Sequence, residues 1–321
     1  MPHKRLKSTL HALALSVALA STSLMAAPSP PALAAPATAR SAKASTWKTV
    51  PTQTIAVGDA TFAYRELGTQ NGGTPVLLLA HLAAVLDNWD PRIVDGLAAK
   101  HHVIAFDTRG VGASTGTPAN TIEQMADDAL RFIEAKGLPQ VDLFGFSMGG
   151  MISQEIVLKS PQRVRKMILA GTGPAGGQGI STVAGVANYD LIRALLTGQD
   201  PKQYLFFTRS AKGIEAGQAF LARLQERTQQ RDADIAFGAY VAQLQALGAW
   251  GRKQPSDLSL VQQPVLVVNG DDDRMVPTRN SHDLAQRLPH AQLIIYPDAG
   301  HGGIFQYHED FVAQALAFLS P

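Results

Sequence analysis

One serine lies in a sequence pattern that is typical of a nucleophile. Gly145-Phe146-Ser147-Met148-Gly149 has the form G-x-S-x-G, follows an aliphatic run that begins at Val141, and precedes a helical pattern. A sharp turn from strand to helix holds its central residue in a strained conformation, so its near neighbours must lack side chains, and both are glycines. Such a turn exposes the Ser147 hydroxyl beside a helix N-terminus, where unpaired N–H groups stabilise negative charge. We therefore interpret Ser147 as a nucleophile.

A serine hydroxyl needs a base to activate it and an acid to orient that base. His301 follows the last apolar run of the chain, on a loop with three glycines at positions 300, 302 and 303. Asp271, Asp272 and Asp273 follow the apolar run before it. We choose Asp273 as the acid because it lies beyond the turn that begins at Gly270. We expect His282 and His290, at the ends of a surface helix, to be solvated, and His308 to be structural.

Short aliphatic runs predict the elements that position these side chains. Continuous apolar runs are typical of strands buried on both faces of a parallel sheet, and helix-length patterns lie between them. An alternating pair at 53–57 and 61–66 predicts an antiparallel hairpin before them. The result is an α/β fold. Its parallel strands have their carboxyl ends at one edge of the sheet, where Ser147, Asp273 and His301 would meet. The predicted parallel strands are 75–80, 103–106, 141–146, 167–170, 264–268 and 293–296, and the clearest helices are 121–136, 149–160 and 281–288.

A long insertion interrupts this alternation of strands and helices. About 90 residues separate the strand that ends near Ala170 from the strand that begins at Pro264. They start with a Gly-rich stretch and continue with patterns that bring apolar residues onto one side of a helix. The sequence therefore predicts a helical cap, residues 175–255, over a core formed by residues 47–174 and 256–321. The helices expected in the cap are 187–196, 201–207, 215–230 and 235–247.

The first residues resemble a targeting signal rather than part of the fold. Basic residues at 4, 5 and 7 precede an apolar run from Ala12 to Ala27, and Ala32-Leu33-Ala34 forms a small-x-small cleavage pattern. The apolar run is shorter than the roughly 20 residues that a membrane span needs. We therefore predict a signal peptide at 1–34, a flexible lead-in at 35–46, and a periplasmic or secreted mature protein without a membrane span.

The composition excludes several classes of protein and of site. The chain has 321 residues, 45% of them hydrophobic, and no cysteine, so it is neither disordered nor able to form a disulfide or a thiolate metal site. Three basic residues and no acidic residue lie in 1–34, so the remainder is nearly neutral and has no basic stripe for nucleic acid. The Gly-rich run 171–179 lacks the Lys-Ser/Thr of a phosphate loop. We expect no metal, no cofactor and no nucleic-acid partner.

Five motifs in order make the chain, from about residue 50 onward, resemble the α/β-hydrolase superfamily. They are Leu79–Ala83 and Asp107–Ser114, each after a strand, the Ser147 turn, Gly270–Pro277, and Gly300-His301 before a closing helix. The order nucleophile, acid, base is that of this superfamily. The resemblance is to its branch of small serine esterases, enol-lactonases and cofactor-free haloperoxidases. It implies an α/β-hydrolase fold with a mostly parallel sheet, helices on both faces and a helical cap.

The resemblance also implies a mechanism and a set of roles. His301 would take the proton of Ser147 while Asp273 holds the imidazole, and water would then release an acyl-enzyme. The backbone N–H groups of Met148 and, carried over from the family, Ala83 would stabilise the oxyanion. This chain has Leu82 where the family usually has glycine. We expect His81, Asp107 and Arg109 to brace loops rather than to contact substrate.

The predicted function is that of an exported serine hydrolase that cleaves a small, largely apolar carboxylic ester or lactone. Two alternatives use the same three side chains: a cofactor-free perhydrolase or haloperoxidase, in which peroxide replaces water, and a carbon–carbon bond hydrolase. Dehalogenases and epoxide hydrolases of this fold attack with a carboxylate, so serine at position 147 argues against both.

Overall fold

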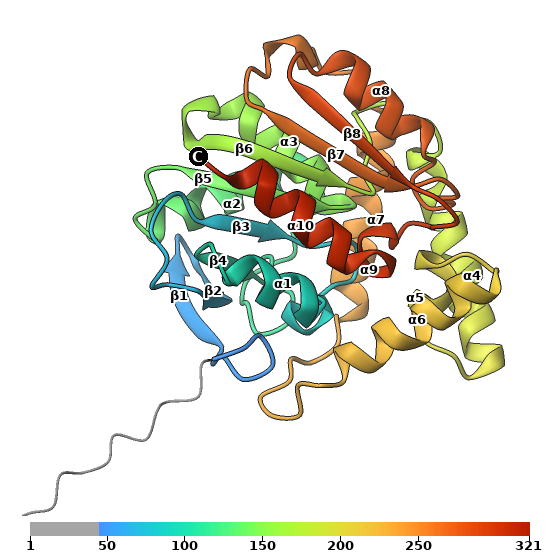
Figure 1. The fold of residues 1–321 in the computed structure, drawn as a ribbon. Coiled ribbons are helices and arrows are strands. Elements are labelled where there is room, and N and C mark those ends of the chain that lie inside the picture. Colours follow the sequence, from blue (N-terminus) through green and yellow to red (C-terminus); the bar gives the residue numbers. More distant parts are fainter. Residues whose placement is uncertain (1–44) are drawn as a thin grey trace, which may run out of the picture. The chain divides into compact units, whose positions relative to one another are not determined.

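The computed structural model describes residues 45–321 (Figure 1). The predicted signal peptide, 1–34, and residues 35–44 of the predicted lead-in lie outside the described residues. Within 45–321, no helix has both the length and the apolar composition that crossing a bilayer requires.

Eight strands form one sheet in the order β1-β2-β4-β3-β5-β6-β7-β8. The strand β2 is antiparallel to β1 and to β4, and every other neighbouring pair is parallel. This arrangement confirms both the predicted hairpin and the predicted parallel sheet. The strands are β1 (Gln53–Val57), β2 (Ala60–Leu67), β3 (Val76–Leu79), β4 (Val103–Phe106), β5 (Val141–Phe146), β6 (Val164–Ala170), β7 (Val265–Gly270) and β8 (Ala291–Tyr296).

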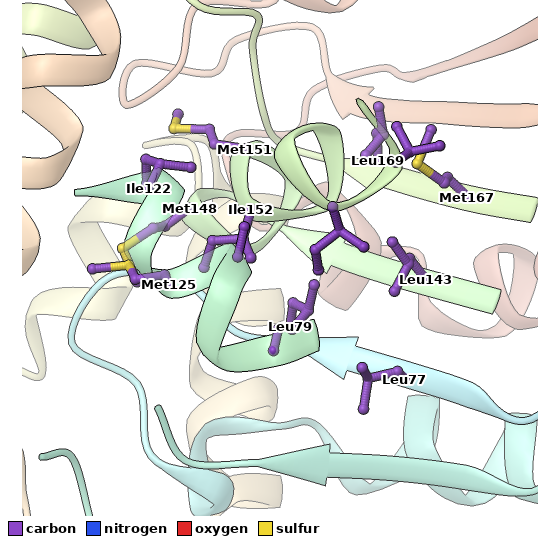
Figure 2. Packing of buried hydrophobic residues seen from close by; sticks show 14 of the residues in the cluster. Leu77, Leu79, Ile122, Met125, Leu143, Met148, Met151, Ile152, Met167 and Leu169 are labelled. Carbon is purple, nitrogen blue, oxygen red and sulfur yellow. The ribbon is translucent and has the colours of Figure 1, made fainter. Parts of the chain in front are cut away.

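Helices cover both faces of the sheet, and alternate strand residues face each layer. Leu77 and Leu79 of β3 join the apolar cluster that includes α2 (Ile122–Ala135), α3 (Met148–Lys159) and α8 (Arg279–Arg287). Val76 and Leu78 join the opposite cluster, which includes α1 (Pro91–Ala98), α9 (Gly303–Gln306) and α10 (His308–Leu319). Figure 2 shows the first cluster, with strand and helix side chains filling one layer. The buried layers fix the strand ends from which the catalytic candidates project.

Local signals explain which helices the sequence predicted. Thr121 caps α2 by accepting a hydrogen bond from the backbone N–H of Gln124, as expected of a threonine before an apolar periodic stretch. The helix α1 was not predicted, because its eight residues are too few for a clear period and include Gly96 and the β-branched Ile93 and Val94. Short 3₁₀ helices lie at Leu86–Asn88, Pro161–Arg163, Ile180–Thr182 and Leu258–Leu260.

The insertion between β6 and β7 is helical, as predicted, and its four α-helices lie within 175–255. They are α4 (Val183–Thr197), α5 (Pro201–Phe206), α6 (Ala211–Leu224) and α7 (Phe237–Arg252). The predicted helix 215–230 is wrong at both ends: Ser210 caps α6 through the N–H of Gly213, and residues 225–236 are not helical. In Figure 1, α4, α5 and α6 lie toward the end of the sheet to which the β3 arrow points.

Candidate active site

Ser147 lies on a strained turn between β5 and α3. Its φ of 56° and ψ of −117° fall outside the regions that side-chain-bearing residues ordinarily adopt. A Cβ atom at Gly145 would lie 2.4 Å from the Gly149 carbonyl oxygen, and one at Gly149 would lie 1.9 Å from the Leu79 carbonyl oxygen. Both positions therefore require glycine, for the steric reason that the sequence pattern implied. The turn is fixed by the packing of α3 against the end of β3.

His301 and Asp273 form a buried hydrogen-bonded pair. His301 Nδ1 lies 2.8 Å from Asp273 Oδ2, and both side chains are almost fully buried. The other carboxylate oxygen, Oδ1, accepts hydrogen bonds from the backbone N–H groups of Met275 (2.8 Å) and Val276 (2.9 Å). Because a carboxylate accepts, the imidazole donates from Nδ1, which leaves Nε2 as the proton acceptor. This tautomer has the lone pair on Nε2, which is the arrangement that a general base requires.

The neighbouring carboxylates have other partners. Asp271 accepts a hydrogen bond from the Ala299 backbone N–H, and Asp272 is exposed. Of the three consecutive aspartates, Asp273 is therefore the one that contacts His301. His282 and His290 are exposed, as predicted.

Ser147 and His301 line one cavity of about 310 Å³ at the carboxyl ends of β3, β5 and β8. The His301 ring packs against Phe146, the residue before Ser147, with 5.0 Å between ring centroids. Most of the remaining wall comes from the cap, with apolar side chains of α4, α5 and α7. Among them are Leu191, Leu205 and Phe237. The cavity therefore suits a small, largely apolar molecule.

His81, on the loop after β3, lines the same cavity but braces its own loop. Its Nδ1 lies 2.7 Å from the Leu82 carbonyl oxygen, and its ring makes edge contacts with Phe146 and Phe206. Burial, with the positive charge of Lys202 acting in the same direction, lowers the pKa of His81 to about 3. The ring is thus neutral at pH 7 and donates from Nδ1 to the carbonyl.

The two predicted oxyanion donors differ in what surrounds them. Met148 is the first residue of α3, so its N–H has no intrahelical partner. The N–H of Ala83 donates to Gln243 Oε1 of α7 at 2.7 Å, and Ala83 has a φ of 63°. Leu82 forms part of the cavity wall. Sequence reasoning missed Gln243, because it lies 160 residues from its partner in a helix defined only by its apolar pattern.

Asp107 and Arg109 brace loops, as expected. Asp107 Oδ1 accepts the Leu86 N–H at 2.9 Å, and burial raises the pKa of this carboxyl to about 8. Arg109 pairs with Asp128 and Asp59. Neither residue lines the cavity. Within residues 45–321, no three His, Asp or Glu side chains are grouped so as to hold a metal ion.

The fold and this site together define a class of protein. The pattern of the alpha/beta hydrolase fold family matches residues 74–306, so the chain belongs to that family. The solved structure of an alpha/beta hydrolase fold protein from Chitinophaga pinensis is 40% identical, with a TM-score of 0.81, over 86% of this chain and 99% of that one.

Two curated relatives carry functional names. BpoC of Mycobacterium tuberculosis, named as a candidate non-heme bromoperoxidase, is 26% identical over 80% of this chain and 97% of its own. The pimeloyl-[acyl-carrier protein] methyl ester esterase of Nitrosomonas europaea is 26% identical over 75% of this chain and 94% of its own. One relative is named for a haloperoxidase activity and the other for an esterase activity, and both activities were considered from the sequence.

Proposed function

We propose that this protein is a serine hydrolase that cleaves a small carboxylic ester or lactone through an acyl-enzyme on Ser147. The observation that carries the proposal is the 2.8 Å contact between His301 and Asp273, beside a cavity that Ser147 and His301 both line. An imidazole oriented through Nδ1 has its Nε2 available to take the proton of a nucleophile.

The proposed reaction has two steps. Ser147 Oγ attacks the acyl carbon and transfers its proton to His301 Nε2, which passes that proton to the departing alkoxide as the ester bond breaks. Water then attacks the acyl-enzyme, again losing a proton to His301, and Ser147 Oγ leaves as the hydroxyl. Asp273, fixed by two backbone N–H groups, stabilises the imidazolium in both steps. The Met148 N–H donates to the oxyanion and stabilises it. The Ala83 N–H would be the second donor, once its hydrogen bond to Gln243 Oε1 is replaced by one to the oxyanion.

Replacing the nucleophile tests the proposal. We expect Ser147→Ala to lower kcat for 4-nitrophenyl acetate by at least about 10⁴-fold, because the acyl-enzyme cannot form. Thermal unfolding of the variant serves as the control for folding. A fluorophosphonate should label wild-type protein at Ser147, located by peptide mass spectrometry. Undiminished turnover by the variant, or a label on another residue, would contradict the proposal.

A perhydrolase is the second candidate, favoured by the similarity to BpoC. Running an ester panel with and without hydrogen peroxide separates the two, because a perhydrolase forms peracid from the same acyl-enzyme.

We also propose that the chain is exported, because residues 1–34 have the pattern of a signal peptide. Export can be tested by measuring the mass of the protein recovered outside the cytoplasm of an expressing bacterium. Cleavage of the signal peptide would lower that mass by that of residues 1–34.

A further inference from the structure

The cavity beside Ser147 has a largely apolar wall that includes one lysine. Apart from Ser147 and His301, its polar lining residues within 45–321 are His81, Tyr240 and Lys202. His81 is neutral at pH 7, since burial lowers its pKa to about 3. The Tyr240 hydroxyl donates to Asn188, and burial raises the pKa of Tyr240, so it too is neutral. Lys202 is therefore the group that gives this wall its charge.

The Lys202 ammonium is only weakly paired within the protein. Its Nζ lies 3.4 Å from both carboxylate oxygens of Asp200. Charge-assisted N–H···O bonds are normally about 2.7–2.9 Å long. Lys253, for comparison, lies 2.6 Å from each of its partners, Glu123 and Glu155. An ammonium has three donors, so Lys202 retains capacity to bind a further anionic group.

The position of Lys202 places this charge close to the reacting groups. It is the second residue of α5, whose last residue, Phe206, packs against His81 and His301 with ring centroids 5.0 and 5.5 Å apart. After burial, the charge of Lys202 is among the causes that lower the pKa of His81. Because Lys202 and Ser147 line the same small cavity, a molecule bound there would lie beside both residues.

We propose that Lys202 binds a carboxylate carried by the substrate, so that the protein acts on esters or lactones that also bear an acidic group. This inference rests on the proposed function and names its substrate class. An apolar substrate would cover the ammonium without replacing its hydration, which is costly. A carboxylate replaces that hydration with an ion pair, and the apolar wall strengthens the pair. Lys202 thus selects between two esters that Ser147 would attack alike.

A pair of esters with matched acyl chains tests this selection. Mono-4-nitrophenyl glutarate and 4-nitrophenyl pentanoate have acyl chains of equal length and the same leaving group, and only the first ends in a carboxylate. The readout is the ratio of their kcat/KM values. We expect wild-type protein to favour the glutarate ester, and Lys202→Met to lower the ratio by at least about tenfold, the effect of losing a charge-assisted contact.

Further variants separate charge from structure. Lys202→Arg should restore most of the ratio, because it keeps the positive charge. Asp200→Asn should raise the ratio by removing the competing carboxylate, while asparagine still caps α5. Lys100→Met, at an exposed lysine before β4 and therefore at the opposite edge of the sheet, is the matched control and should leave the ratio unchanged. About 1 M NaCl should lower the wild-type ratio by screening.

Two results would overturn the inference: a wild-type preference for the pentanoate ester, or a Lys202→Met variant with the wild-type ratio. A binding measurement distinguishes failure of this inference from failure of the proposed hydrolase activity. If wild-type protein turns over neither ester, calorimetry with Ser147→Ala, alone and combined with Lys202→Met, reports binding of the intact esters. Tighter binding of the glutarate ester that depends on Lys202 supports the inference, and equal binding of both esters contradicts it.

Discussion

Two turns at the carboxyl ends of neighbouring strands hold a non-glycine residue at positive φ, and they do so by different means. The turn after β5 holds Ser147 at 56°, and the loop after β3 holds Ala83 at 63°. Around Ser147, Gly145 and Gly149 allow backbone atoms to approach within distances that no Cβ permits. The Ala83 loop is braced within itself by the contact of His81 Nδ1 with the Leu82 carbonyl, and the Ala83 N–H is held from outside by a 2.7 Å hydrogen bond to Gln243 of the cap.

The two turns differ in how far along the chain the residues that hold them lie. The glycines that the Ser147 turn requires lie two positions on either side of it, so the pattern G-x-S-x-G records them, although the backbone that crowds Gly149 belongs to β3. The Ala83 conformation depends on a side chain that the cap helix α7 delivers. We therefore expect substitutions at the Ser147 turn to have large effects and substitutions around Ala83 to have small ones.

Gly149→Ala should have the largest effect. Its Cβ would lie 1.9 Å from the Leu79 carbonyl oxygen, so the backbone of α3 or β3 must move. We expect the free energy of unfolding to fall by about 1–3 kcal/mol and ester kcat/KM to fall at least about 100-fold. Urea unfolding and steady-state kinetics measure the two effects. Gly185→Ala is the matched control, because a Cβ at this position in α4 meets no atom within 4 Å. An active, stable Gly149→Ala variant would show that the turn is not sterically locked.

Gln243→Met should have a smaller effect, with opposite signs on stability and rate. The variant keeps the length of the side chain and loses the carbonyl that accepts the Ala83 N–H. We expect stability to fall by about 1 kcal/mol and kcat/KM to rise a few-fold, because the oxyanion no longer competes with Gln243 for that donor. A tenfold loss of kcat/KM would instead mean that Gln243 holds the loop in its reactive arrangement.

The sequence predicted the sheet because each parallel strand contains a short, mainly apolar run, and β5 is correct at both ends. Ser147, Asp273 and His301 could be proposed together because the carboxyl ends of parallel strands share one edge. Their catalytic roles stay predictions. The turn chemistry around Gly270 also singled out Asp273, the aspartate that contacts His301.

The cap was harder to predict, for a physical reason. Its helix ends depend on capping residues rather than on the apolar pattern: Ser210 begins α6, and the pattern alone placed that helix several residues too far along the chain. Two residues on which the proposals above depend come from this region: Gln243, which accepts the Ala83 N–H, and Lys202, which lines the cavity. The Gln243 contact joins residues 160 positions apart, and no local pattern distinguishes either Gln243 or Lys202.

Ala83→Gly should have the smallest effect and gives the sharpest test of strain in the loop. Alanine at a φ of 63° costs about 1–2 kcal/mol relative to glycine, and glycine costs about 0.4–1 kcal/mol through the unfolded chain. We expect the relief of strain and the glycine penalty to offset one another, so that the free energy of unfolding in urea changes by less than about 1 kcal/mol. Ala84→Gly is the comparison variant: Ala84 is buried and lacks positive φ, so this variant bears the glycine penalty and the loss of a buried methyl group without any relief of strain. If the free energy of unfolding falls equally in both variants, Ala83 stores no strain. The two turns would then differ only in the hydrogen bond that joins Ala83 to Gln243.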